Sequence, residues 1–341
     1  MGRCVAFMTA EGTPQDQGDA ICYAQWNQSK KGEKKEKAEP VISKTAISKA
    51  DRPIPPWWRH SLTLRKLLRE AWQESSADWG NKILTALQNG DANAARKLLK
   101  STPDIQSAIA DTLGSKPLAI MTTAGKKAHA YWTKLEGKGG KKKDVSDTNY
   151  LLSKADTMAT PPPETYSQRL QRLHAEQVAR FAEEYPGRIL HPEITRLIDL
   201  MDSYDVARDI DILQIAERAN RVIAADAYWN DLSTLQVNRL WQADGVKYAE
   251  ENGVNRLQIV AILDEVTCPV CIVMNGQEVA VKQQSKKIDK GLNIEDPEEY
   301  AQAWRFPRFN EVQLLDSDEI TGKGYAPPFH PNCRCQSRWL R

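Results

Sequence analysis

The sequence lacks any apolar run long enough to cross a membrane, because charged and polar residues interrupt every hydrophobic stretch. It also lacks the start of a secretory signal, since Glu11, Asp16 and Asp19 follow closely on the first residues. We therefore expect neither a membrane span nor secretion.

Net charge is almost absent as well. The 47 lysines and arginines against 45 aspartates and glutamates leave +2. A protein whose whole surface serves nucleic acid is usually more basic, so any contact with DNA must come from local patches. The 341 residues, 41% of them hydrophobic, are enough for a large core and for more than one domain.

Composition and hydrophobic periodicity divide the chain into six parts, and no internal repeat is visible. We expect an α+β fold that is mainly α, with helical N-terminal regions before a small zinc-stapled C-terminal domain. In order, the parts are a short helical element (1–28), a charged flexible linker (29–52), a small helical domain (53–135), a basic and proline-rich linker (136–163), a helical bundle or stalk (164–228) and an α+β domain (229–341).

The expected helices and strands differ in the period of their apolar residues. In the helical parts these residues recur every three or four positions, as in Leu64, Leu68 and Trp72. The last part instead contains short β-branched runs. Strands are predicted for 257–263 and 278–281, and the chain end from Cys333 to Arg341 is a candidate for a third.

Cysteines are few and unevenly placed. Of the six, four lie in the last quarter of the chain, as a C-x-x-C and a C-x-C. A disulfide scaffold normally belongs to a much shorter, secreted chain, so this clustering indicates metal or redox chemistry. Cys4 and Cys22 stand among apolar residues at helical spacing, and we expect them to be small core residues.

The clustered cysteines and one histidine have the spacing of a zinc site. A C-x-x-C turn directs two sulfurs at one ion, and closed tetrahedral sets of Cys and His are structural. Cys333 and Cys335 compete for one position, because residues two apart on a strand face the same side. The sequence thus predicts structural Zn²⁺ held by Cys268, Cys271 and His330 with one or both of Cys333 and Cys335.

Two other uses of these residues are less consistent with the pattern. A thioredoxin-like C-x-x-C does not explain the second cysteine cluster. A catalytic zinc needs an open coordination position and a nearby acid or base, for which only Asp264 and Glu265 stand close in sequence. Acidic residues at such a junction are usually caps or solvated, so we assign no catalytic residue.

Lysine runs occupy both linkers. The run at 29–37 is interleaved with acidic residues and is expected to be solvated. Lys138, Lys141, Lys142 and Lys143 are better candidates for non-specific contact with DNA phosphates, a contact that salt would weaken.

The cysteine and histidine motifs resemble those of a known family. Asp264-x-x-Thr267-Cys268-x-x-Cys271, Gly276 and then Pro327-Pro-x-His-Pro-x-Cys-Arg-Cys335 are similar to the signature of phage Mu protein F-like minor head proteins. The resemblance covers roughly residues 165–341, including the helical segment Glu217-Arg-Ala-Asn220. A less specific similarity to phage head proteins lies between Cys4 and Cys22.

The resemblance implies a protein of phage head morphogenesis, and we expect it to be non-enzymatic. Such minor capsid proteins are present in few copies, associate with the portal or the major capsid protein, and in some phages enter the cell with the DNA. The implied location is the virion head, assembled in the cytoplasm of the bacterial host.

Two enzyme classes are the alternatives to a head protein. For a zinc-dependent hydrolase or nuclease, no H-x-x-E-H-like or H-N-H-like set is visible. An ADP-ribosyltransferase would need an Arg, Ser-Thr-Ser and Glu-x-Glu series in order, which the sequence lacks.

Overall fold

The computed structural model describes residues 55–136, 164–203, 212–263, 267–292, 294, 299, 309–323 and 325–340. The expected N-terminal element and nearly all of both linkers lie outside these residues. So do Cys4, Cys22 and the lysines at 138 and 141–143, the candidate DNA contacts.

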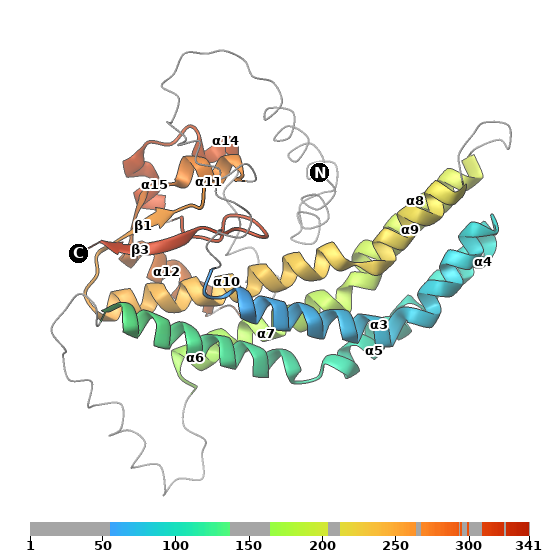
Figure 1. Ribbon diagram of the computed structural model, residues 1–341, viewed down its shortest axis with the longest axis horizontal. Coiled ribbons are helices and arrows are strands. Elements are labelled where there is room, and N and C mark those ends of the chain that lie inside the picture. Colours follow the sequence, from blue (N-terminus) through green and yellow to red (C-terminus); the bar gives the residue numbers. More distant parts are fainter. Residues whose placement is uncertain are drawn as a thin grey trace, which may run out of the picture.

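The described chain is mainly helical with a small C-terminal sheet, which confirms this part of the expected fold (Figure 1). The first part, which we call the helical platform, consists of α3 (Trp58–Gln88), α4 (Ala92–Leu99), α5 (Thr102–Leu113), α6 (Lys116–Glu136), α7 (Tyr166–Tyr185), the short π-helix η1 (Pro186–Leu190), α8 (His191–Ser203), α9 (Ile212–Ala224) and α10 (Asp226–Glu251). The second, which we call the C-terminal lobe, contains β1 (Arg256–Val260), α11 (Pro269–Met274), β2 (Glu278–Ala280), α12 (Val281–Leu292), α14 (Phe309–Val312), α15 (Ser317–Lys323) and β3 (Gln336–Leu340).

The platform is elongated, with the C-terminal lobe at one end and α4, α8 and α9 at the other (Figure 1). Local sequence sets several helix starts. The Asp91 side chain accepts a hydrogen bond from the Ala94 amide at 2.9 Å and begins α4. Thr165 and Gln168 cap each other's backbone at the start of α7, as a capping box.

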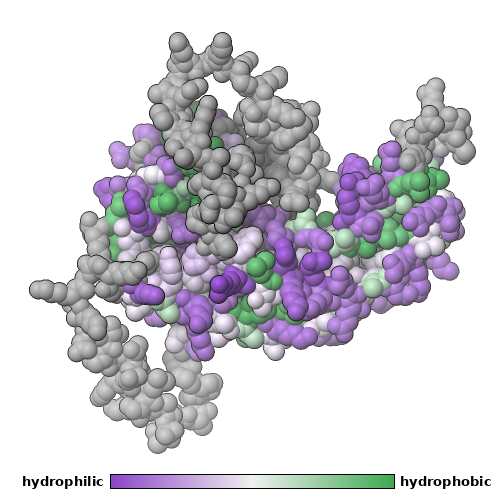
Figure 2. Space-filling view, viewed as in Figure 1, coloured by the Kyte–Doolittle hydropathy of each residue, from purple (hydrophilic) through white to green (hydrophobic). Residues whose placement is uncertain are grey.

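On the face seen in Figure 2, hydrophilic residues cover most of the platform, and hydrophobic ones form separate areas.

Helix α10 lies at the centre of the fold. It packs against α3, α6 and α7 of the platform and against α12 of the lobe. Every residue from Asp231 to Val246 is buried, so its sequence shows no single apolar stripe. The buried set includes the polar residues Asp231, Ser233, Thr234, Gln236, Asn238, Arg239, Gln242 and Asp244.

Helix α10 spans one of the boundaries predicted from the sequence. The boundary expected at 228/229 falls inside α10, and the platform continues to Glu251. The two helical units expected at 53–135 and 164–228 also share one core, because α10 and α7 both pack on α6. Sequence periodicity identifies the apolar face of each helix, but it does not identify the second helix that packs on that face. The common core of the two helical units could therefore not be predicted.

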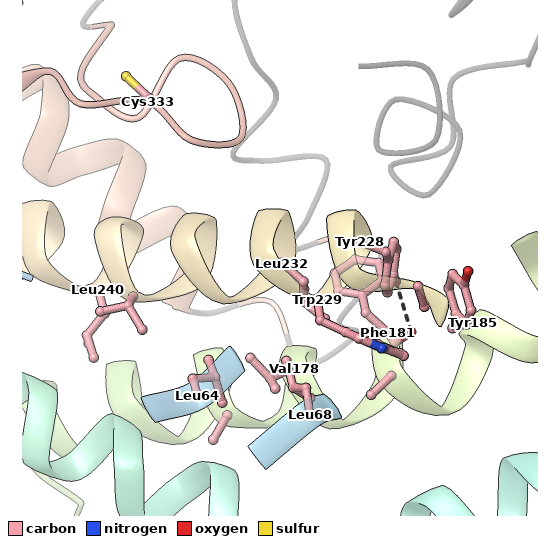
Figure 3. Packing of buried hydrophobic residues seen from close by; sticks show 14 of the residues in the cluster. Leu64, Leu68, Val178, Phe181, Tyr185, Tyr228, Trp229, Leu232, Leu240 and Cys333 are labelled. Atoms are coloured by element: carbon pink, nitrogen blue, oxygen red, sulfur yellow. Dashed lines mark hydrogen bonds between the residues drawn. The ribbon is translucent and has the colours of Figure 1, made fainter. Parts of the chain in front are cut away.

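Aromatic side chains hold the middle of the platform together. Trp72, Tyr185 and Trp229 meet with ring centroids 5.0–6.0 Å apart, and the Trp72 indole donates to the Ile223 carbonyl at 2.7 Å. The Tyr228 hydroxyl donates to the Phe181 carbonyl at 2.9 Å (Figure 3). The polar atoms of Trp72 and Tyr228 are therefore satisfied, whereas the buried Trp229 Nε1 has no hydrogen-bond partner among the described residues.

The three strands form an antiparallel sheet in the order β2-β1-β3. Leu257 pairs with Val279 on one side and with Trp339 on the other. The strands are shorter than predicted. β1 ends at Val260 rather than Leu263, and Val281 begins α12, a helix that the sequence analysis did not identify.

The C-terminal lobe rests on the platform through α12 and β3. The Trp339 ring stacks between Trp132 and Tyr248, with centroids 5.7 and 5.5 Å away and interplanar angles of 18°. The Trp132 ring in turn packs closely on α10 at Gly245, where an added Cβ would lie 2.5 Å from the ring atom Cζ2.

Among the helices that the structure describes, none has the length and hydrophobicity to cross a membrane.

Two titratable groups buried beside or within α10 have opposite effects on stability. Burial lowers the pKa of His174, whose Nδ1 bonds to Gln236 Oε1 at 2.8 Å, to about 3. Burial, reinforced by Glu251, raises the pKa of Asp244 to about 7. As pH falls from 6.5 towards 3, the unfolded state alone takes a proton on the histidine, and stability falls. As pH falls from 7 towards 4, the folded state alone takes one on Asp244, and stability rises.

We predict that variants of these residues change the pH dependence in opposite directions. His174→Asn, which keeps a donor near Gln236, should reduce the loss of stability between pH 6 and 4 by up to about 1.4 kcal/mol per pH unit. Asp244→Asn should increase that loss by a similar amount. Urea unfolding at several pH values and fixed metal content measures both. Curves that stay parallel to the wild-type curve would show that neither group titrates as its burial requires.

Candidate metal centre

The start of α11 brings two thiols to one point. Cys268 is the N-cap residue, in extended backbone conformation, and Pro269 occupies the first helical turn. The Cys268 sulfur accepts a hydrogen bond from the Cys271 amide at 3.3 Å. This arrangement, a side chain capping the N–H three residues on, turns both cysteine side chains of the C-x-x-C motif to the same side.

The loop before β3 supplies the other donors. The Cys333 amide donates to the His330 carbonyl at 3.1 Å, which closes a tight turn, and Asn332 within it has a φ of +60°. His330 Nδ1 donates to the Pro331 carbonyl at 2.5 Å. That bond orients the ring and turns Nε2 towards the cysteines, 3.1 Å from Cys271 Sγ, where it can serve as a ligand once it is deprotonated.

All five residues predicted as ligands meet in one cluster. The donor atoms of Cys268, Cys271 and His330 lie within 4.8 Å of one another, and so do those of Cys271, Cys333 and Cys335. Cys271 belongs to both groups, and its sulfur is 3.8 Å from that of Cys333. Cys271, Cys333 and Cys335 are buried, and Cys268 and His330 are partly so.

Crowding sets the protonation of these groups. The hydrogen bond from Cys271 lowers the pKa of the Cys268 thiol to about 5. Burial lowers the pKa of His330, but the Cys333 and Cys268 thiolates outweigh it and hold that pKa well above its usual range. The neighbouring thiols raise the pKa of Cys271, with Cys268 the largest influence.

This pattern shows that the four thiols cannot all be deprotonated at once unless a cation balances their negative charge. Each thiolate formed in the cluster makes the next one harder to form, because like charges repel strongly at low dielectric. A divalent cation removes that restriction, since metal-bound thiols are deprotonated outright. The residues present therefore fit a metal ion with sulfur and nitrogen ligands.

Other candidates from the sequence do not join the cluster. Asp264 and Glu265, considered as acid or base for a catalytic metal, lie outside the described residues. Within the described ranges, the groups able to hold an ion consist of cysteine and histidine alone. His60, His129 and His174 lie on the platform, and neither of these groups includes them. The C-x-x-C pair thus has three further donors beside it, which a simple redox dithiol would not require.

The chain was compared with protein-family models, with curated proteins and with solved structures, and none of the three comparisons gave a match.

Proposed function

We propose that the cluster binds one structural Zn²⁺ through Cys268, Cys271, His330 and Cys333. Zinc accepts sulfur and imidazole ligands in a tetrahedron, and structural sites use four protein donors. Cys333 is favoured over Cys335 as the fourth ligand because it interacts with both His330 and Cys271. Cys335 then remains a neutral thiol that donates to the Cys333 sulfur, an interaction that helps to lower the Cys333 pKa.

Burial supports a structural rather than a catalytic ion. Cys271 and Cys333 are only 3% and 1% exposed, which leaves little room for a substrate beside the metal. The ion would also join α11 to the segment before β3 across the intervening residues 272–329. Closing so long a loop is where a metal staple stabilises most in theory.

We further propose that the chain is a non-enzymatic minor head protein of a tailed phage. The observation that carries this proposal is the convergence of the C-x-x-C and H-x-x-C-x-C motifs, far apart in sequence, on one closed cluster beside an extended helical platform. The platform offers long helical surfaces for the portal or the major capsid protein. The lysine-rich linker at 138–143 is the proposed contact with packaged DNA.

The choice of ligands predicts different outcomes for two neighbouring cysteines. Cys333→Ser should lose bound zinc and lower the thermal stability of the C-terminal lobe, because a tetrahedral site loses one of its four donors. Cys335→Ser should retain one zinc per chain and serves as the matched control. Elemental analysis of the purified full chain measures both. Equal zinc content in the two variants would contradict this ligand set, and zinc absent from the wild type would contradict the metal site.

The proposed role predicts where the protein is found. Quantitative mass spectrometry of purified particles from the parent phage should detect the full chain at a few copies per head, far below the major capsid protein. Procapsids purified in parallel are the control for loss during maturation. Absence from both particle types would overturn the role in the head and revive the zinc hydrolase alternative.

A further inference from the structure

The loop that carries His330 and Cys333 is held by the buried central helix. The side-chain amide of Asn238 on α10 donates to the Cys333 carbonyl at 3.0 Å. Asn238 is 0% exposed and Cys333 1% exposed, so this bond is made away from water. Figure 3 shows Cys333 on its loop on the side of α10 away from Leu64 and Val178.

A second contact holds the residue before Cys333. The Asn332 side-chain amide donates to the buried Asp231 carboxylate, and its carbonyl oxygen accepts from Asn230 Nδ2 at 2.8 Å. Asn230 itself accepts from Arg65 Nη1 of α3 at 3.0 Å. Asn332, which has a left-handed backbone conformation, lies in the chain between the proposed ligands His330 and Cys333. Both the nitrogen and the oxygen of its side-chain amide are hydrogen-bonded.

These contacts come from a single face of α10. Asp231 precedes Asn238 by seven residues, about two helical turns, so these two side chains lie in one row, and Asn230 lies beside that row. Gln242, one turn further, donates to Asn238 Oδ1 at 3.3 Å. That bond occupies the carbonyl oxygen of the Asn238 amide and directs its N–H group to the Cys333 carbonyl.

We infer that Asn230, Asp231 and Asn238 are positioning residues that couple metal binding to docking of the C-terminal lobe on the helical platform. This inference rests on the proposed metal site. Ligands are held in geometry by hydrogen bonds from outside the coordination sphere, and loss of such a partner typically costs about 10–100-fold in metal affinity. Such coupling is reciprocal. If α10 stabilises the loop geometry that binds the metal, then bound metal must also stabilise the docking of that loop on α10.

The test measures zinc transfer from the full chain to a chromophoric chelator. Asn238→Ala removes the bond to Cys333, and Asn332→Gly removes the amide while tolerating the positive φ. Each should release zinc roughly 10–100-fold faster than the wild type, with helical content unchanged by circular dichroism. Asn252→Ala is the matched control, because Asn252 donates to the Tyr248 carbonyl at 2.8 Å at the end of the same helix, remote from the cluster.

A second measurement needs no variant. Hydrogen exchange of the wild-type chain, with zinc and after its removal, should show faster exchange not only at 268–274 and 327–335 but also along α10 between Asn230 and Gln242. Acceleration confined to the two ligand segments would overturn the coupling. So would release from Asn238→Ala and Asn332→Gly at the wild-type rate. A wild-type chain that binds no Zn²⁺ would defeat the proposed site itself, and that outcome is distinct from both.

Discussion

The structure depends on burying α10, a helix rich in polar side chains, on all sides. Each buried amide, hydroxyl or carboxylate costs free energy unless it finds a partner, and several find theirs on other elements. Gln236 bonds to His174 of α7, whereas Asp231 and Asn238 bond to the loop before β3. The helix therefore determines both how the platform packs and where the C-terminal lobe lies. Its polar groups need hydrogen-bond partners at particular positions, whereas an apolar surface could pack against many neighbours.

The contact with α10 and the cysteine cluster both act on the loop that leads to β3 in the C-terminal lobe. Its sheet has three short strands, and sheets of that size need support from a packed neighbour. Trp339 supplies part of that support by stacking on Trp132 and Tyr248 of the platform. The cluster includes Cys335, the residue directly before β3. In our account a metal ion there holds the two halves of the lobe together.

Sequence alone predicts the features that depend on local spacing. Leu64, Leu68 and Trp72 are all buried on α3, as their spacing predicts, and the five Cys and His donors meet as the motifs indicate. The predictions failed where burial comes from a distant neighbour. α10 shows no apolar stripe because it is covered all round. α12 carries mostly polar residues, so the apolar run that ends at Val281 indicates a strand although Val281 begins the helix. The bond from Asn238 to Cys333 joins residues far apart in the chain and has no sequence signal.

The central claim is a closed metal site made of thiolate and imidazole ligands, and X-ray absorption at the zinc edge tests it most directly. The full chain as purified should show one zinc per molecule with sulfur neighbours at about 2.3 Å and one nitrogen neighbour at about 2.0 Å. A shell made largely of oxygen, or with a water in an open position, would contradict a closed structural site and indicate a metal available for chemistry.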